Sequence, residues 1–318
     1  RTYLLRAAAR LRALDALPGT VSKFAAACGL GEPAARRLLR ALCELRLVER
    51  REAWAGEAET EQFYATGRGS LLADAHPFSL RAAAQHWADA YVEGWRHLDE
   101  RLRSQGSEAE ASWFAHLADS PAQLAMYHRM LRSYALHDYR AAAALPGWSQ
   151  HRHVIDAGGG TGALIELLLA QHLHLQGTLL ERPEVAALTS WPVALAPRSR
   201  VQPGDLFEAW PCYADAVCLA KVLHDWPDEA ARVILRHALA ALAPAGSAGR
   251  LYIIEGVLSE SGGQGGLLDL HMLVSIAGRE RTQRDFEALL ASAGGQLLAR
   301  HQLTRWLSVL VCAPAPLQ

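Results

Sequence analysis

The sequence has few cysteines and lacks the spacing of a disulfide framework. Its 318 residues contain only five, with no Cys-x-x-Cys pair: Cys28, Cys43, Cys212, Cys218 and Cys312. This distribution argues against a secreted, disulfide-linked fold and favours a reducing compartment. We expect these side chains to serve as small core residues.

Long apolar runs and a strong net charge are also missing. No apolar run of about 18 residues is free of charge, and no basic segment followed by an apolar one opens the chain. The formal net charge of −1 argues against nucleic-acid binding through a global basic field. We therefore predict a cytoplasmic protein that binds neither a membrane nor nucleic acid. Because the chain begins with Arg1 and not with methionine, we expect residues to be missing before it.

The first third of the chain has mostly helical patterns. The whole chain, with 51% hydrophobic residues, can bury sizeable cores, and its length favours about two domains. Residues 21–29 predict a capped short helix that ends at a glycine, and Pro33 marks the first turn of a second helix. Residues 47–50 and 63–66 are similar to the two strands of a small wing. We expect residues 1–105 to form a helical winged-helix domain.

From His153 onward, short apolar segments alternate with helical patterns. This alternation is typical of an α/β fold in which right-handed crossovers join the strands of a parallel sheet. We expect residues 106–318 to form such a domain. Its strands are predicted at residues 154–157, 177–181, 216–219, 250–255 and 306–312.

A glycine-rich turn follows the first of these strands, which ends in Asp156 and Ala157. The turn is Gly158-Gly-Gly-Thr-Gly162. Its glycines allow positive φ and remove the Cβ atoms that would keep a ligand from the backbone. The helix that begins at Ala163 directs free N–H groups and its positive dipole end toward the turn. The segment predicts a nucleotide site, and its spacing alone does not say which nucleotide.

Polar residues also follow the later strands. Ligands of open parallel sheets bind at the carboxyl ends of the strands. Glu181 ends the second strand, 19 positions after Gly162, close to the separation at which a carboxylate binds ribose hydroxyls. Gly204-Asp205-Leu206 offers an acid for the adenine amine beside an apolar contact. The predicted strand at residues 216–219 continues into a segment, Lys221–Trp226, that contains His224-Asp225-Trp226.

Taken together, these segments resemble the class I S-adenosylmethionine-dependent O-methyltransferases, in the family that includes plant caffeic acid and bacterial natural-product O-methyltransferases. The resemblance extends over nearly the whole chain. It implies a Rossmann-like domain that binds S-adenosylmethionine, preceded by a winged-helix domain through which two subunits form a homodimer. The matching segments are the winged helix, Asp156–Gly162, Gly204-Asp205, Lys221–Trp226, the strand to Glu255, Asp269–Leu273 and Gly278–Thr282.

The resemblance implies a role for each matching residue in cofactor binding. Gly158 and Gly160 would let the backbone approach the methionine part of the cofactor, and Glu181 would bind the ribose. Most relatives have an aspartate followed by Leu-Pro at this point, whereas this chain has Glu181-Arg182-Pro183. The remaining implied contacts are Asp205 and Leu206 beside the adenine, and Lys221 and Trp226 over it.

It also implies the catalytic and acceptor-binding residues. His224 would be the general base, and Glu255 and Glu280 the acids that orient it. The acceptor pocket would be lined by Met126, Met130, Asp269 and Met272.

The chemistry needed for methyl transfer agrees with a role as base for His224, which follows the predicted strand at residues 216–219. The cofactor's methyl group is already activated, so the enzyme must bring a nucleophile in line and remove its proton. A histidine with an ordinary pKa of about 6.5 can accept a phenolic proton, and a nearby carboxylate fixes its tautomer. We expect the strand of Glu255 to lie beside that of His224, whereas Glu280 is placed only by the resemblance.

Two other interpretations are possible for parts of this pattern. Asp225, Asp228 and Glu229 offer clustered oxygens for a hard cation, but acids after Pro227 also suit the first turn of a helix, so we predict no metal. The second is a winged-helix DNA-binding regulator. It rests on arginines of the winged helix: Arg36, Arg37, Arg40, Arg46, Arg50 and Arg51.

We predict an enzyme that transfers a methyl group to a hydroxyl of an aromatic or polyketide-like small molecule. The loop Ser275-Ile276-Ala277 lacks the asparagine of the plant enzymes, and the segment before Glu280 is one residue shorter. A plant phenylpropanoid acceptor is therefore disfavoured. Methylation of carbon or nitrogen, and chemistry without methyl transfer, are the alternatives within the same family.

Overall fold

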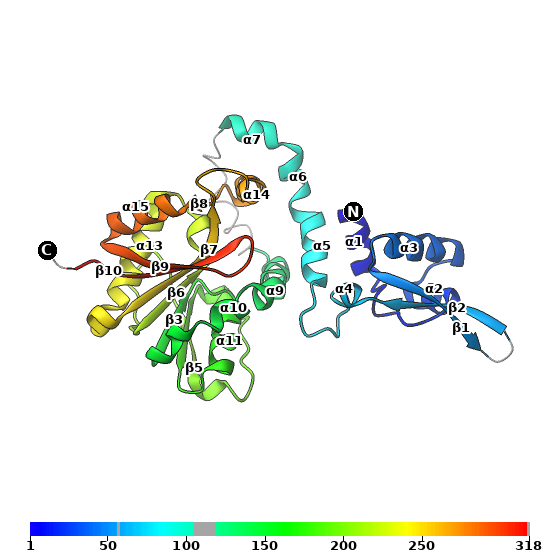
Figure 1. Ribbon diagram of the computed structural model, residues 1–318, viewed down its shortest axis with the longest axis horizontal. Coiled ribbons are helices and arrows are strands. Elements are labelled where there is room, and N and C mark those ends of the chain that lie inside the picture. The colour runs from blue at the N-terminus through cyan, green and yellow to red at the C-terminus, as the bar shows by residue number, and fades with distance from the viewer. Residues whose placement is uncertain (56–57, 105–118, 317–318) are drawn as a thin grey trace. The chain divides into compact units, whose positions relative to one another are not determined.

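The computed structural model describes residues 1–55, 58–104 and 119–316 (Figure 1). They form two compact units, one of Arg1–Val92 with Arg129–Tyr134 and the other of Glu93–His128 with Ala135–Gln318. The expected domain boundary at residues 105 and 106 falls outside the described residues. The helix α9 (Pro121–Asp138) contributes to both units.

The N-terminal unit contains helices followed by a hairpin. Helix α2 begins after Thr20, whose side chain accepts a hydrogen bond from the Lys23 N–H, and ends at Gly29 in the left-handed conformation. Leu39 and Leu42 of the next helix are fully buried. The elements are α1 (Thr2–Arg10), α2 (Val21–Cys28), α3 (Glu32–Glu44), β1 (Val48–Ala55), β2 (Ala58–Ala65), α4 (Gly67–Ser70) and α5 (Arg81–Ala90). Since β1 and β2 pair antiparallel, the two expected wing strands are confirmed and are longer than predicted.

The C-terminal unit is built around a mixed sheet with the strand order β5-β4-β3-β6-β7-β10-β9, and β8 pairs with β7. The predicted α/β, Rossmann-like class is confirmed. The strands are β3 (His153–Ala157), β4 (Gln176–Glu181), β5 (Ser199–Pro203), β6 (Ala216–Ala220), β7 (Arg250–Leu258), β8 (Arg281–Thr282), β9 (Gly295–Gln302) and β10 (Leu307–Pro314).

The expectation of an all-parallel sheet is wrong at its C-terminal side. The strands β5, β4, β3, β6 and β7 are parallel, but β10 runs antiparallel to both β7 and β9. The reason is the short connection after Gln302, which allows a hairpin but has no room for a crossover helix. Glu255 also lies within β7 and does not end it.

Helices cover both faces of this sheet (Figure 1). Ile155 packs in one core cluster with Leu235 and Leu290, whereas its neighbour Val154 packs in the other with Leu168. Successive strand residues thus point to opposite faces, and both faces are buried. The helices are α6 (Val92–Arg96), α7 (Leu98–Ser104), α9, α10 (Arg140–Ala143), α11 (Ala163–Gln171), α12 (Pro183–Ala186), α13 (Asp228–Ala241), α14 (Gly266–Ile276) and α15 (Gln283–Ala293), with the 3-10 turns η1 (Pro146–Gln150), η2 (Ala196–Arg198), η3 (Leu223–Asp225) and η4 (Ala243–Ala248).

Two further sequence expectations can be compared with the fold. All five cysteines are free, and Cys28, Cys218 and Cys312 are buried, as expected of core residues. Within the described part of the chain, none of the helices combines the length and apolar character needed to cross a membrane.

Candidate active site

The glycine-rich turn connects β3 to α11 and packs closely against neighbouring side chains. Gly158, Gly160 and Gly162 have φ angles of 70°, 60° and 81°. A Cβ atom on Gly158 would lie 2.9 Å from a methyl carbon of Val222 and 3.2 Å from one of Leu206. Glycine is required here both by the left-handed backbone and by this close approach.

Asp156 lies fully buried below the turn. Neither carboxylate oxygen has a hydrogen-bond partner among the described residues, and a Cβ atom on Gly159 would overlap one of them. Burial, and then the charge of Glu181, raise the pKa of Asp156 to about 7. A buried carboxyl without a partner is costly in a folded protein, so its presence here indicates a site that is completed by a ligand.

Glu181, at the end of β4, is attached to the same turn. Its carboxylate accepts hydrogen bonds from the Gly160 N–H and the Arg182 N–H, each at 2.8 Å. Burial raises the pKa of this carboxyl, and the two backbone donors partly oppose the effect. Each oxygen retains a second lone pair, so both can still accept a hydrogen bond from a ribose hydroxyl.

The expected adenine contacts lie on two loops of the same unit. The Asp205 carboxylate accepts a hydrogen bond from the Phe207 N–H at 2.9 Å, and Leu206 packs against the turn at Gly158. The rings of Phe207 and Trp226 meet edge to face, with centroids 4.7 Å apart. The two loops thus present the Asp205 carboxylate beside an apolar surface formed by Leu206, Phe207 and Trp226.

Lys221 has a partner that the sequence did not predict. It follows β6 with a φ of 54°, unusual for a residue other than glycine, and its ammonium group pairs with Asp138 of α9. The ammonium also lies 5.9 Å from the centre of the Tyr139 ring. Non-glycine residues with positive φ concentrate at functional sites, where the surrounding structure holds them.

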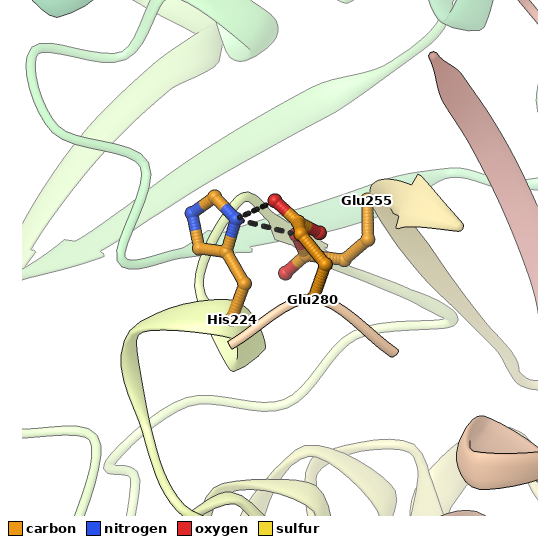
Figure 2. A group of neighbouring side chains, drawn as sticks. All are labelled: His224, Glu255 and Glu280. Atoms are coloured by element: carbon orange, nitrogen blue, oxygen red, sulfur yellow. Dashed lines mark hydrogen bonds and ion pairs between the residues drawn. The ribbon is translucent and has the colours of Figure 1, made fainter. Parts of the chain in front are cut away.

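His224 lies in the 3-10 turn η3 and contacts three carboxylates. Its Nδ1 is 3.1 Å from Glu280 Oε1 and 3.3 Å from Glu255 Oε2, and Figure 2 shows both acids on this side of the ring. Its Nε2 is 3.3 Å from Asp225 Oδ1. The structure therefore brings His224, Glu255 and Glu280 together as expected, and adds Asp225 on the opposite side of the ring.

Hydrogen bonds to the backbone hold this turn from two sides. Glu255 Oε1 accepts the N–H groups of Val222 and Leu223, at 2.9 and 2.8 Å. On the other side, the Arg279 N–H donates to the carbonyl of His224 at 2.8 Å. Because both flanks are fixed, the ring has little freedom to leave the acids.

Arg281 is a structural part of the site that sequence analysis did not identify. Its side chain is fully buried and donates to the carbonyls of Leu223 and Trp226 and to the carboxylate of Asp228. The sequence signal was its place directly after Glu280. Because the Asp228 carboxylate pairs with this arginine, its position is explained without a role as a metal ligand.

The three acids change the charge state expected of His224. Burial by itself would lower the pKa of the imidazole, but the negative charges of Glu255, Asp225 and Glu280 more than reverse this and raise the pKa to about 10. Burial raises the pKa of Asp225 to about 7 and also raises that of Glu255. In the ligand-free protein the imidazole is therefore protonated at neutral pH.

The same cluster has donor atoms arranged as in metal sites. His224, Glu255 and Glu280 each offer one ligand atom, and all three atoms lie within 4.8 Å of one another. The raised pKa of His224 instead favours a protonated imidazole at this place, with Nδ1 donating to Glu280.

The residues expected to bind the acceptor lie on two helices. On α14, Asp269 accepts a hydrogen bond from the Glu280 N–H at 2.8 Å, and Met272 is buried. On α9, Met126 is half-buried and Met130 is fully buried, the latter within the segment counted with the N-terminal unit. Asp269 thus positions the backbone of Glu280, and the sequence did not predict this contact.

Comparisons with known proteins identify the family. The sequence model of the O-methyltransferase domain family matches residues 95–296. The O-demethylpuromycin O-methyltransferase of Streptomyces alboniger is 32% identical over 288 residues, covering 86% of this chain and 74% of that protein. The 8-amino-8-demethylriboflavin N,N-dimethyltransferase of Streptomyces davaonensis is 30% identical over 325 residues, covering 98% of this chain and 91% of that protein.

A solved structure gives a further comparison. The O-methyltransferase NcsB1 from neocarzinostatin biosynthesis, in complex with S-adenosylmethionine and 2-hydroxy-5-methyl naphthoic acid, superposes with a TM-score of 0.73 at 29% identity, covering 98% of this chain and 95% of that one. The fold and the strand-end site define a class I methyltransferase. The chain belongs to the O-methyltransferase domain family and is an S-adenosylmethionine-dependent enzyme.

Proposed function

We propose that this enzyme methylates a hydroxyl group of an aromatic or polyketide-like small molecule, with His224 as the general base. The observation that supports this proposal is the position of His224, held against Glu255 and Glu280 directly after β6. Val222, two residues before it, packs against the glycine turn. A proton acceptor therefore lies beside the predicted cofactor site.

The cofactor site is formed by the ends of β3, β4 and β6. When bound, S-adenosylmethionine supplies a methyl group activated by its sulfonium. Gly158 and Gly160 leave the backbone open to its methionine part, and Glu181 accepts the ribose hydroxyls. The adenine is bound by Asp205, Leu206, Lys221 and Trp226. The partnerless carboxyl of Asp156 supports a ligand at this turn.

His224 accepts the proton of the acceptor hydroxyl at Nε2 while Nδ1 donates to Glu280. A pKa of about 10 matches that of a phenol, so the proton transfer is nearly balanced in free energy. The base must first be neutral. A cation in the adjacent cofactor site favours this form, because a like charge lowers the pKa of an imidazolium.

We propose that the reaction needs no metal ion. A metal at His224, Glu255 and Glu280 would have to displace the proton that these acids stabilise, and Glu255 Oε1 is already occupied by two backbone donors. Turnover should be unchanged after dialysis against EDTA. Loss of activity that returns with a divalent cation would contradict metal independence.

The acceptor is proposed to bind against Met126, Asp269 and Met272, which all belong to the C-terminal unit. One relative is named for O-demethylpuromycin, and the NcsB1 structure contains a naphthoic acid, which is an aromatic ring system. The thioethers provide an adaptable apolar surface for such rings. Asp269 is already bonded to Glu280, so it links acceptor binding to the proton-accepting cluster.

A labelled-cofactor assay against a panel of phenols tests the base. His224→Ala should lower kcat by about 10²- to 10⁴-fold and leave cofactor affinity within about twofold. His301→Ala, on the exposed part of β9, is the matched control and should retain full activity. Unchanged methyl transfer by the His224 variant would contradict the assigned role.

Nitrogen methylation is the second candidate, because the riboflavin-type relative is an N,N-dimethyltransferase. An amine acceptor, once it is neutral, needs less help from a base than a phenol. A panel that pairs each phenol with its aniline analogue separates the two. Faster transfer to the anilines, together with insensitivity to His224→Ala, would favour nitrogen methylation.

We propose that residues 1–105 form a winged-helix domain that joins two subunits, and not a DNA-binding module. Three of the six arginines that could face DNA are paired with acids: Arg36 and Arg50 both contact Glu61, and Arg51 contacts Glu49. Light scattering should give the mass of a dimer. A monomer at micromolar concentration would contradict this assignment.

A further inference from the structure

His128 is a buried histidine beside the glycine turn that the proposed reaction does not use. It lies on α9, is 7% exposed, and belongs to the same unit as the turn. Its Nδ1 is 3.3 Å from the point where a Cβ atom on Gly160 would lie. The side chain therefore faces the part of the turn that glycine keeps open.

The Nδ1 atom has no hydrogen-bond partner among the described residues. The ring of the adjacent Tyr127 meets it edge to face, with centroids 5.5 Å apart, and provides no acceptor at Nδ1. Burial of an imidazole nitrogen without a partner is unfavourable. A buried imidazole nitrogen that has no partner and lies beside a ligand-binding turn indicates that a ligand completes it.

The surroundings of His128 favour an anion. Burial, and then the positive charge of Arg182, lower the pKa of His128 to about 4, so the ring is neutral and one of its nitrogens carries a proton. Helix α11 begins at Ala163, directly after the turn, and directs its positive dipole end toward the same place. Glu181 contacts Gly160 through the backbone N–H, a different direction from that of His128.

We propose that His128 Nδ1–H donates a hydrogen bond to the methionine carboxylate of S-adenosylmethionine. This carboxylate is the only anionic group of the cofactor, whose ammonium and sulfonium are cations. His128 is therefore a cofactor-positioning residue that fixes the methionine end over the turn. The proposal rests on the cofactor assignment and does not depend on which acceptor is methylated.

Calorimetric titration without any acceptor tests the contact. The two ligands are S-adenosylmethionine and decarboxylated S-adenosylmethionine, which differ only in the carboxylate. His128→Leu should weaken binding of the first by about 10- to 100-fold and change binding of the second by less than about twofold. His128→Asn should recover part of the loss, because the asparagine amide places a donor near the position of Nδ1. The exposed His137→Leu, on the same helix, should bind both ligands like the wild type.

Two results would overturn the proposal: normal S-adenosylmethionine binding by His128→Leu, or an equal loss for both ligands, which would indicate packing and not a carboxylate contact. Thermal melting of each variant checks that it is folded, and His128→Asn provides the comparison if the leucine variant is not. Failure of the wild type to bind S-adenosylmethionine would instead contradict the cofactor assignment, so the two failures are distinguishable.

Discussion

The two halves of the active site are built in different ways. The glycine turn after β3 is one continuous segment, residues 156–162, and its properties come from backbone conformation and missing Cβ atoms. The His224 cluster combines η3, the middle of β7 and the loop before β8, with up to 56 residues between partners. The first is a local structure, whereas the second exists only when the sheet is assembled.

This difference predicts how each half responds to substitution. A change in the turn should act on ligand affinity, since the turn contributes shape and few charges. A change in the cluster should act on proton transfer and on folding, because buried charges there depend on one another.

The largest effect is expected at Glu255, which is fully buried. Glu255→Ala leaves the Val222 and Leu223 N–H groups without an acceptor and removes a charge beside His224. It should lower the free energy of unfolding by about 3–5 kcal/mol, measured by urea denaturation. Glu255→Gln keeps an acceptor oxygen and should cost clearly less. Equal losses in the two variants would show that the backbone hydrogen bonds are unimportant.

A smaller effect is expected in the turn. Gly158→Ala places a methyl group against Val222 and Leu206, and should weaken S-adenosylmethionine binding by about 10- to 100-fold. The control is Gly294→Ala, which has a similarly positive φ but open space around it. If the control lost as much affinity, backbone strain and not the shape of the cofactor site would be responsible.

A change in pH dependence is expected at Glu280. The pKa of His224 is raised to about 10, so the neutral base, and with it kcat/KM, should increase as the pH rises toward that value. Glu280→Gln removes one supporting negative charge and lowers this pKa, so activity should level off at a pH about one unit lower. Glu287→Gln, on the exposed side of α15, is the control. An unchanged pH profile would show that Glu280 does not set the basicity of His224.

The smallest effect concerns the N-terminal unit. Because Arg36, Arg50 and Arg51 are paired with glutamates, we expect no binding to duplex DNA in a fluorescence anisotropy titration at about 0.15 M salt. Tight, salt-dependent binding would instead support the hypothesis of a DNA-binding regulator, in which the N-terminal unit binds DNA.

Much of the fold could be predicted from the sequence, but the strands at the edges could not. Strands β3, β4, β6 and β7 were found from their apolar runs, because both faces of the central sheet are buried. Strand β5 (Ser199–Pro203) and strand β9 (Gly295–Gln302) were missed. They lie at the two ends of the sheet order and are only partly buried, so they lack a continuous apolar pattern.

The sequence by itself determined the local features of this enzyme. One is the turn at residues 158–162, because φ angles depend on adjacent atoms. The family could also be recognised from the sequence, because enough of its motifs are continuous segments. The tertiary structure alone decided which acids meet His224, that Arg281 closes its turn, and that His128 faces Gly160. Those contacts join residues far apart in the chain, and burial then sets their charge. A histidine expected to have an ordinary pKa is for that reason held protonated by three carboxylates.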